Sequence, residues 1–447
     1  MIQIMNIFIT AFLLALIYDI ASVGSIKTNY IRHHLGSRTP YRFVANKNDT
    51  RIKYPNCKDA KIYMVTRHGT RLPSRKDIAA VPQLVELKYE VLLQHEQGKG
   101  QLTNEQLNNF KDWKTTFDAD EESYLTLEGR DEMILLAERM QKRFPNAIKQ
   151  RYSNKTFLFR YTATQRAQQS ARYFANGLFE KKESQDVIFA PATKVDPVLR
   201  FYKHCDRWLT QVKRNPETYK ETKLFSQSRD MNKTLESISR RLGLNRVLEF
   251  DTVNLMYKYC GYETSWDKHH ISPWCYAFDE RSIQMFEYYH DLRAYWLDGY
   301  GHELTYRQAC LLMKNMFEYF GKEHGYRSIF LFSHSGAVLK ILTHLNLFKP
   351  SSPLKGDQIV KDREWRLSEI DSFAANLAFV LFKCKDGDHV LTLHQEKIIK
   401  LPMCKHELCP LEHLKEYFHE SINNCDYADM CSLDSNVTES KEGKTQL

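Results

Sequence analysis

The sequence lacks any apolar run long enough to cross a membrane, and it lacks clustered tracts of Lys and Arg. Its main apolar stretch, Ile7–Tyr18, falls short of the ~20 residues that a transmembrane helix needs. The net charge is +9, but the basic residues are spread along the chain and form no nucleic-acid-binding signature. Excess positive charge raises the local concentration of anions, so a small polyanionic partner is favoured over nucleic acid.

The apolar stretch Ile7–Tyr18 has the length of the hydrophobic region of a signal peptide, and small residues follow it. We therefore predict a signal peptide over residues 1–24, cleaved after Gly24. No Lys or Arg precedes the stretch, so a buried N-terminal strand is the alternative. Cleavage would remove one charged residue, Asp19, and raise the net charge from +9 to +10.

The ten cysteines are even in number, which fits pairing in an oxidising compartment. Proximity along the chain suggests three pairs: Cys260 with Cys275, Cys404 with Cys409, and Cys425 with Cys431. Four N-glycosylation sequons favour the same compartment, at Asn48, Asn154, Asn232 and Asn436. The final residues, Lys-Thr-Gln-Leu, do not match a Lys-Asp-Glu-Leu retention signal. We expect a secreted protein or one in the lumen of the secretory pathway, the endoplasmic reticulum included.

An apolar strand, a short polar loop and a helix follow one another repeatedly along the chain. Strands are expected at 61–67, 156–161 and 328–332, and helices at 126–144, 165–179 and 337–348. Further strands at 374–384 and 390–394 have a turn between them that predicts an antiparallel hairpin. This order is typical of an α/β fold. We predict a central, mostly parallel sheet with helices on both faces.

Two polar segments, 75–122 and 206–310, interrupt this pattern with helical periodicity and few strand signals. We predict that together they form a helical cap inserted into the α/β core. The core would then comprise residues 25–74, 123–205 and 311–432. The polar residues 433–447 would form a tail without a core of its own.

Basic side chains lie where the predicted strands end. Arg67 and His68 end the first strand, Arg166 lies in the first turn of the helix after the second, and His334 follows the third. In α/β sheets, ligands bind beyond the carboxyl ends of the strands. Three distant segments therefore predict one anion-binding rim.

Residues 67–73 read Arg-His-Gly-Thr-Arg-Leu-Pro. An imidazole such as that of His68 can attack phosphorus and hold the phosphoryl group covalently. The guanidinium groups of Arg67 and Arg71 can each grip phosphate oxygens bidentately and neutralise charge during transfer. Gly69 lets the backbone approach closely. The segment therefore predicts a phosphate-attacking loop.

This loop resembles the signature of the histidine acid phosphatases, also described as branch 2 of the histidine phosphatases. From about residue 30 to about 432 the chain is also similar to the multiple inositol polyphosphate phosphatases. The similar segments are His34–Tyr41, Leu199–Cys205, Ser272–Asp279, Tyr295–Gly301 and Phe373–Val380. The resemblance implies an α/β domain and a helical domain with the active site between them. It also implies removal of phosphates from inositol phosphates such as phytate, and for some members from 2,3-bisphosphoglycerate.

The resemblance also implies roles for single residues, without a metal or cofactor. His68 would be the nucleophile. Arg67, Arg71 and Arg166 would bind the scissile phosphate, and His334 would complete the pocket.

Basic residues outside this pocket are candidates for binding the other phosphates of a polyphosphate. They are Arg75, Lys76, Lys203 and His204. A solvated surface charge is the alternative for each of them.

The chain departs from the family pattern directly after His334. The family usually has Ala-Glu there, or Asp in related phosphatases, and this acid protonates the leaving alcohol; here Ser335 and Gly336 follow. General acid catalysis typically contributes ~10²–10⁴-fold to a rate. Glu369 and Asp371 are candidate replacements, and water could serve a leaving group of low pKa.

Three functions stay open at this point. The first is a phosphatase that hydrolyses inositol polyphosphates through a phosphohistidine intermediate. The second is a phosphatase of broad specificity for small phosphomonoesters. The third is a catalytically silent protein that binds polyanions. The intact loop around His68 favours an enzyme, and the missing acid favours the silent protein.

Overall fold

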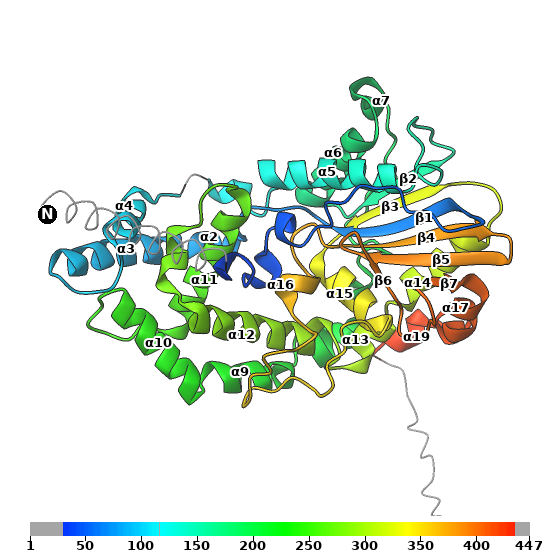
Figure 1. Ribbon diagram of the computed structural model, residues 1–447. Coiled ribbons are helices and arrows are strands. Elements are labelled where there is room, and N and C mark those ends of the chain that lie inside the picture. The colour runs from blue at the N-terminus through cyan, green and yellow to red at the C-terminus, as the bar shows by residue number, and fades with distance from the viewer. Residues whose placement is uncertain (1–29, 116, 434–447) are drawn as a thin grey trace, which may run out of the picture.

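The computed structural model describes residues 30–115 and 117–433. The predicted signal peptide, most of the predicted tail and the sequon at Asn436 lie outside the described residues. A sheet with its covering helices occupies one end of the molecule, and a group of helices occupies the other (Figure 1).

Seven strands form one mixed sheet in the order β2-β3-β1-β4-β5-β6, with β7 also paired to β5. They are β1 Cys57–Arg67, β2 Phe157–Tyr161, β3 Ser328–Ser333, β4 Asn376–Cys384, β5 Gly387–His394, β6 Lys397–Ile399 and β7 Leu408–Pro410. Strands β2, β3 and β1 run parallel, and β4 to β7 pair in antiparallel fashion. The α/β class and the hairpin β4–β5 are confirmed. The parallel pairing belongs to the half of the sheet that carries the basic strand ends.

The register of the parallel strands brings their carboxyl ends together. Arg67 of β1 is paired with Ser333 of β3, and Tyr161 of β2 is paired with Phe332 of β3. Helix α6 (Gln165–Leu178) starts just after β2, and helix α15 (Ser335–His344) starts just after β3. Loops from three distant segments therefore meet at one edge of the sheet.

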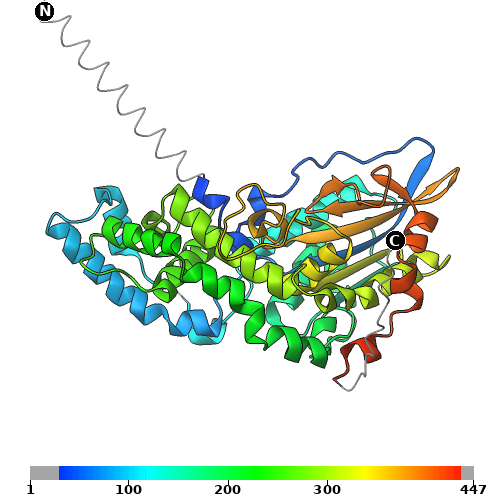
Figure 2. The same cartoon turned by 90° about the horizontal axis from the view of Figure 1, so that it is seen from below.

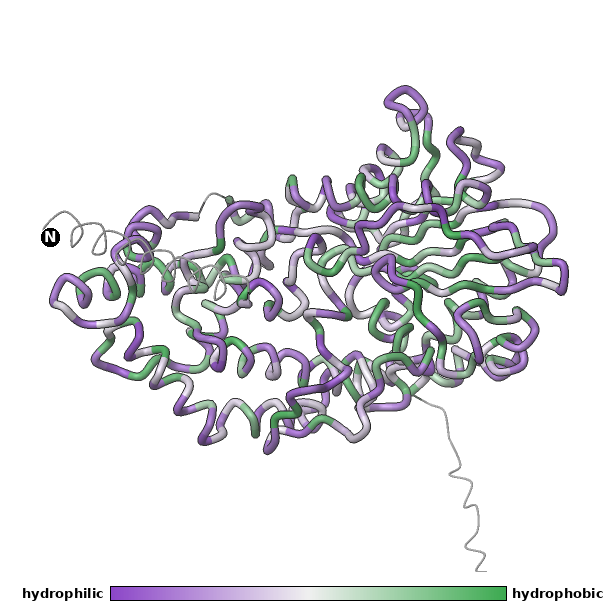
Figure 3. Tube along the Cα trace, viewed as in Figure 1, coloured by the Kyte–Doolittle hydropathy of each residue, from purple (hydrophilic) through white to green (hydrophobic). Residues whose placement is uncertain are grey.

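Side chains of the central strands alternate between two apolar cores, one on each face of the sheet. Hydrophobic residues are frequent along the strands of the sheet (Figure 3). Ile62 and Met64 belong to the core that includes apolar residues of α5 (Leu127–Arg143) and α6. Tyr63 and Val65 belong to the core that includes apolar residues of α14 (Cys310–Gly321) and α15. Because both faces are covered, the strands are apolar on both sides, as their sequence predicted.

The segments predicted as a cap contain helices and no strand among their described residues. The helices are α2 Arg75–Ala79, α3 Val81–Glu96, α4 Asn104–Asp112, α8 Asp206–Trp208, α9 Lys220–Ser226, α10 Arg229–Arg241, α11 Phe250–Trp266, α12 Glu280–Asp298 and α13 Glu303–Arg307. Helices α3 and α11 of the two segments are in contact, and much of both segments lies at the same end of the molecule (Figure 2). Helices α8 and α13 instead pack against α19 and α15, beside the sheet. The division of the chain into core and cap stays a prediction.

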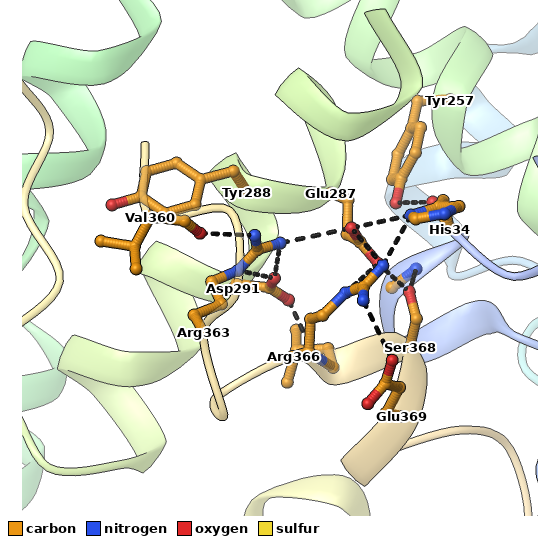
Figure 4. Close-up of polar contacts among 12 residues, drawn as sticks. His34, Tyr257, Glu287, Tyr288, Asp291, Val360, Arg363, Arg366, Ser368 and Glu369 are labelled. Carbon is orange, nitrogen blue, oxygen red and sulfur yellow. Dashed lines mark hydrogen bonds and ion pairs between the residues drawn. The ribbon is translucent and has the colours of Figure 1, made fainter. Parts of the chain in front are cut away.

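A buried network of ion pairs joins helix α12 to the segment around α16 (Leu367–Ile370) (Figure 4). Arg363 Nε donates to Asp291 at 2.8 Å, and Arg363 Nη2 lies 3.2 Å from Glu287 Oε2. Ser368 Oγ donates to Glu287 Oε1 at 2.6 Å. The side chains of Glu287 and Asp291 are almost fully buried, so the network closes this junction to water.

Five disulfides involve all ten cysteines: Cys57–Cys384, Cys205–Cys431, Cys260–Cys275, Cys310–Cys425 and Cys404–Cys409. The predicted pairs Cys260–Cys275 and Cys404–Cys409 are confirmed. The predicted pair Cys425–Cys431 is wrong. Helix α19 (Tyr427–Cys431) ends at Cys431 and packs on α8, so Cys431 meets Cys205 instead.

Three short helices complete the described chain: α7 Lys181–Gln185, α17 Leu411–Tyr417 and α18 His419–Asn423. Among residues 30–115 and 117–433, no helix has the length and apolar character to cross a membrane.

Candidate active site

His68 lies directly after β1 and is held by the neighbouring strands. Its backbone N–H donates to the carbonyl of Ser333 at 3.1 Å, and its carbonyl accepts from the N–H of Ala374 at 3.2 Å. The ring is buried, and its Nδ1 atom lies 2.9 Å from the carbonyl oxygen of Gly69. Because a carbonyl only accepts, Nδ1 carries the proton and Nε2 keeps its lone pair.

Burial and the positive charges of Arg166 and Arg67 hold the pKa of His68 well below its ordinary value. The ring is therefore neutral in the free protein over the ordinary pH range. A neutral imidazole with a free lone pair is the form that can attack phosphorus.

The loop after His68 is anchored on helix α5. Thr70 donates to the Glu132 carboxylate twice, from its N–H at 2.7 Å and from its hydroxyl at 2.9 Å. A Cβ atom at position 69 would lie 2.5 Å from the carbonyl oxygen of Gly129. Only glycine fits this close approach, so Gly69 allows the loop to lie against α5.

His334 occupies the N-cap position of α15 and faces His68, with 5.5 Å between the ring centroids. Arg166 Nη2 lies 3.5 Å from His334 Nδ1, and Thr162 Oγ1 lies 2.9 Å from its Nε2. A guanidinium only donates, so Nδ1 accepts and Nε2 carries the proton. Burial, with the charge of Arg166, also lowers the pKa of His334 well below its ordinary value.

The Arg67 side chain is tied to the backbone of two other segments. Its Nη1 donates to three carbonyl oxygens, those of Ser37, Asp371 and Ser372, at 2.7, 2.6 and 3.0 Å. Its guanidinium also lies 4.7 Å from the ring centroid of Phe373. The side chain is therefore fixed before any ligand arrives.

Five arginines lie around the two histidines: Arg38, Arg67, Arg71, Arg166 and Arg200. The Nε of each is buried and has no hydrogen-bond partner among the described residues, as is also the case for Arg32 and Arg366. A buried donor without a partner costs ~1–3 kcal/mol. Burial, followed by the charges of Arg71 and Arg200, lowers the pKa of Arg166 to about 10. An anion bound at this place would satisfy the donors and offset the repulsion.

Sequence reasoning identified Arg67, Arg71 and Arg166 but assigned no role to Arg38 or Arg200. Both lie in segments that carried the family resemblance, which was the available signal. Arg38 lies with its guanidinium 4.7 Å from the ring centroid of Tyr262, and Arg71 lies 5.5 Å from the same ring.

Tyr262 comes from α11 and brings a helix of the predicted cap segment to the phosphate loop. Burial would raise its pKa, but the charges of Arg71 and Arg38 outweigh this and lower it. Its hydroxyl lies 3.3 Å from Asp77, which also binds Lys258 at 2.9 Å. The site therefore draws on both parts of the molecule, a contribution that strand-end reasoning could not find.

The two candidate replacement acids lie in different surroundings. The Glu369 side chain is 63% exposed and paired with Arg366 at 3.0 Å (Figure 4). The Asp371 side chain is fully buried, accepts a hydrogen bond from Ser335 Oγ, and lies 3.5 Å from Arg67 Nη1. Only Asp371 contacts the residues that flank the two histidines.

The candidate basic residues outside the phosphate pocket differ in how exposed they are. Arg75 and Lys76 are exposed on α2, and Arg75 pairs with Glu122 at 3.4 Å. His204 is exposed and hydrogen-bonds a backbone carbonyl. Lys203 is half-buried, and burial and the neighbouring Lys213 lower its pKa to about 8. Lys203 thus lies near Arg200, one of the five arginines around the two histidines, and the other three basic residues lie at the surface.

Comparison with known proteins agrees with this fold. The family model described as histidine phosphatase superfamily (branch 2) matches residues 60–400. The crystal structure of the phytase from D. castellii superposes with a TM-score of 0.74 at 17% identity, covering 90% of this chain and 87% of the other. The crystal structure of a Bifidobacterium longum multiple inositol polyphosphate phosphatase in complex with inositol hexasulfate superposes with a TM-score of 0.63 at 14% identity. The superposition covers 86% of this chain and 97% of the other. The class is therefore that of the branch 2 histidine phosphatases.

Curated relatives narrow the class further. Multiple inositol polyphosphate phosphatase 1 of Drosophila melanogaster is 31% identical over 388 residues, which cover 83% of this chain and 82% of the relative. The protein of that name from Homo sapiens is 26% identical, covering 89% and 85%. The chain belongs to the multiple inositol polyphosphate phosphatase family of the branch 2 histidine phosphatases.

Proposed function

We propose that this protein hydrolyses inositol polyphosphates through a phosphohistidine formed on Nε2 of His68. The observation that carries the proposal is the neutral His68, with its proton on Nδ1, beside five arginines whose Nε donors have no hydrogen-bond partner in the described part of the chain. Such a pocket is built for a highly charged phosphate. Relatives named for multiple inositol polyphosphates support the substrate class.

In the proposed reaction, Arg67, Arg71 and Arg166 hold the equatorial oxygens of the scissile phosphate and His334 completes the pocket. These groups neutralise the charge that spreads over the phosphoryl group during transfer. The lone pair of His68 Nε2 attacks phosphorus, and the bond to the leaving oxygen breaks. Water then attacks the phosphohistidine and releases phosphate.

Lys203, half-buried and adjacent to Arg200, is proposed to bind a further phosphate of the substrate. Arg75 and Lys76, at the exposed start of α2, are proposed to contact only the periphery of a large substrate. A substrate with several phosphates would use both groups, whereas a simple phosphomonoester would use neither.

One observation favours a second function, a silent polyanion-binding protein: Ser335 and Gly336 stand where relatives usually carry an acid. The intact nucleophile loop argues against it. A phosphatase of broad specificity would share the chemistry but would gain nothing from Lys203.

Secretion is proposed on different grounds. Five disulfides are expected of a protein from an oxidising compartment. The sequon residues Asn48, Asn154 and Asn232 are exposed and accessible to glycosylation.

Phosphate release from phytate by the purified protein and by His68→Ala, measured between pH 4 and 8, tests the proposed function. We expect release that disappears in the variant. A folded protein that binds phytate but releases no more phosphate than His68→Ala would be the silent binder. Equal turnover of phytate and of small monoesters, unchanged by Lys203→Ala, would indicate broad specificity.

A further inference from the structure

The position after His334 holds a hydroxyl in place of an acid. Ser335 opens α15, is half-buried, and its Oγ donates to Asp371 Oδ2. The segment 334–336 has no carboxyl group of its own, but Ser335 is hydrogen-bonded to the carboxyl group of Asp371 from a different part of the chain.

Asp371 is fixed close to the reacting groups. Its carbonyl oxygen accepts from Arg67 Nη1 at 2.6 Å, and its Oδ2 lies 3.5 Å from the same atom. Arg67 directly precedes His68, and Ser335 directly follows His334. The Ser335–Asp371 pair thus lies between the segments that carry the two histidines.

The surroundings of Asp371 favour a carboxyl group that holds a proton. Its side chain is fully buried, and its Oδ1 has no hydrogen-bond partner among the described residues. Burial raises the pKa of Asp371 to about 6, Arg67 and Ser335 oppose this, and the nearby Asp298 adds to it. Below about pH 6 the Asp371 carboxyl group is therefore mostly protonated.

The other carboxyl groups are less suited. Asp298 lies beside Gly336, since its Oδ1 is 3.3 Å from the place of a Cβ there, but it is bound to the buried ammonium group of Lys340. Glu369 points to the surface and pairs with Arg366.

We propose that Ser335 and Asp371 form a two-step proton relay that replaces the missing acid, with Ser335 touching the leaving group and Asp371 supplying the proton through it. This proposal rests on the proposed function. It adds the source of the proton, which neither the motif around His68 nor the family pattern supplies.

The relay balances in both half-reactions. When His68 Nε2 attacks phosphorus, the bond to the leaving oxygen breaks and its electron pair stays on that oxygen. When Asp371 is protonated, its O–H donates to Ser335 Oγ, which reverses the direction of their hydrogen bond, and the Ser335 hydroxyl turns toward the leaving oxygen. That oxygen takes the proton of Ser335 Oγ, and Ser335 takes the proton of Asp371, which becomes a carboxylate. In the second half, Ser335 accepts a proton from the attacking water and passes its own to Asp371. The new P–O bond forms, and the N–P electron pair returns to Nε2 of His68.

The test compares two substrates whose leaving groups differ in their need for a proton. The leaving group of phytate is an inositol alkoxide, whose conjugate acid has a high pKa. The leaving group of p-nitrophenyl phosphate is a stable phenolate. We expect Ser335→Ala to lower kcat for phytate ~10²-fold or more and kcat for p-nitrophenyl phosphate by less than about threefold. Ser335→Thr keeps the hydroxyl and should restore phytate turnover. Glu369→Gln is the control and should behave as the unaltered protein.

A pH profile separates a relay from a structural role for Asp371. In the unaltered protein, kcat for phytate should fall as the pH rises through about 6, because Asp371 loses its proton; His68 and His334 are already neutral there. Asp371→Asn should lower kcat for phytate and remove this fall with pH. Like Ser335→Ala, it should lower kcat for phytate much more than kcat for p-nitrophenyl phosphate.

Equal loss on both substrates in Ser335→Ala, or full phytate activity in that variant, would overturn the relay while leaving the phosphatase intact. Failure of the unaltered protein to hydrolyse either substrate would overturn the proposed function, and the relay with it.

Discussion

The proton on Nδ1 of His68 is held by the carbonyl oxygen of Gly69, 2.9 Å away, and this contact decides which ring nitrogen can react. We expect the phosphoryl group to be attached to Nε2. Rapid mixing with phytate, followed by an alkaline quench and phosphorus NMR of the digested protein, should show phosphohistidine of the Nε2 type. Phosphorylation at Nδ1 would contradict the assignment, and His68→Ala should show no signal.

The low pKa of His68 should also be visible in the kinetics. Because burial and the arginines keep the free ring neutral, kcat/KM should not decline between pH 7 and 5 as it would for a histidine with a pKa near 6.5. The dependence of kcat/KM on pH, measured with p-nitrophenyl phosphate so that leaving-group protonation plays little part, is the appropriate experiment. A decline centred near pH 6.5 would show that the ring is protonated in the free protein.

Arg166 should not tolerate replacement by lysine. Its guanidinium contacts His334 and has a buried Nε without a hydrogen-bond partner among the described residues, and a lysine offers one point charge in place of two parallel donors. We expect Arg166→Lys to lower kcat/KM by ~10²–10³-fold. The exposed Arg172 lies on the same helix, so Arg172→Lys is a matched control that should have no effect. Comparable losses in the two variants would point to damage to α6.

Glu132 should make stability depend on pH. Burial raises its folded pKa to about 7, above the ordinary value of 4.5. A carboxyl with a raised folded pKa contributes most below the unfolded pKa, and this contribution is lost as the pH rises to about 7. Glutamine cannot ionise, so the Glu132→Gln variant does not lose stability in this way. Its unfolding free energy, measured relative to that of the unaltered protein, should therefore rise by about 1–3 kcal/mol between pH 5 and 8.

Denaturant titrations at pH 5, 6.5 and 8 would measure this change. Glu138→Gln, at an exposed position of the same helix, is the control and should show a constant difference. A deficit of Glu132→Gln that grows with pH would mean that Thr70 stabilises the charged carboxylate more than burial opposes it.

The two kinds of disulfide should differ in their effect on stability. Cys205–Cys431 joins residues 226 apart in the sequence, whereas Cys404–Cys409 joins residues 5 apart. Loop-closure entropy predicts that replacing the first pair by serines lowers the unfolding free energy by about 2–5 kcal/mol, and replacing the second pair by less. Thermal unfolding of both double variants is the measurement. A larger loss from the short pair would argue that strain or local packing dominates.

The sequence was sufficient for those features that depend on local pattern. Apolar strands followed by polar loops predicted β1, β2 and β3, and the rule for strand ends placed His68, Arg166 and His334 at one edge. The pairs Cys260–Cys275 and Cys404–Cys409 followed from proximity.

Other features depend on packing between distant segments, and no local pattern carries them. Tyr262 reaches the loop from α11, and Asp371 reaches Ser335 from beyond α16, through contacts that only the folded chain creates. The pair Cys205–Cys431 likewise depends on how α19 lies on α8. Glu369 and Asp371 looked alike as sequence neighbours, yet one is exposed and the other buried.

The buried ion pairs between α12 and the segment around α16 have a consequence for how substrate enters. Separating the groups of Arg363, Glu287 and Asp291 would leave unpaired charges in a dry junction, at a cost of ~3–5 kcal/mol for each broken pair. A hinge at this place would therefore stay shut almost all the time. We therefore expect this junction to be closed before a polyanion binds, so that no closing motion there lowers the affinity.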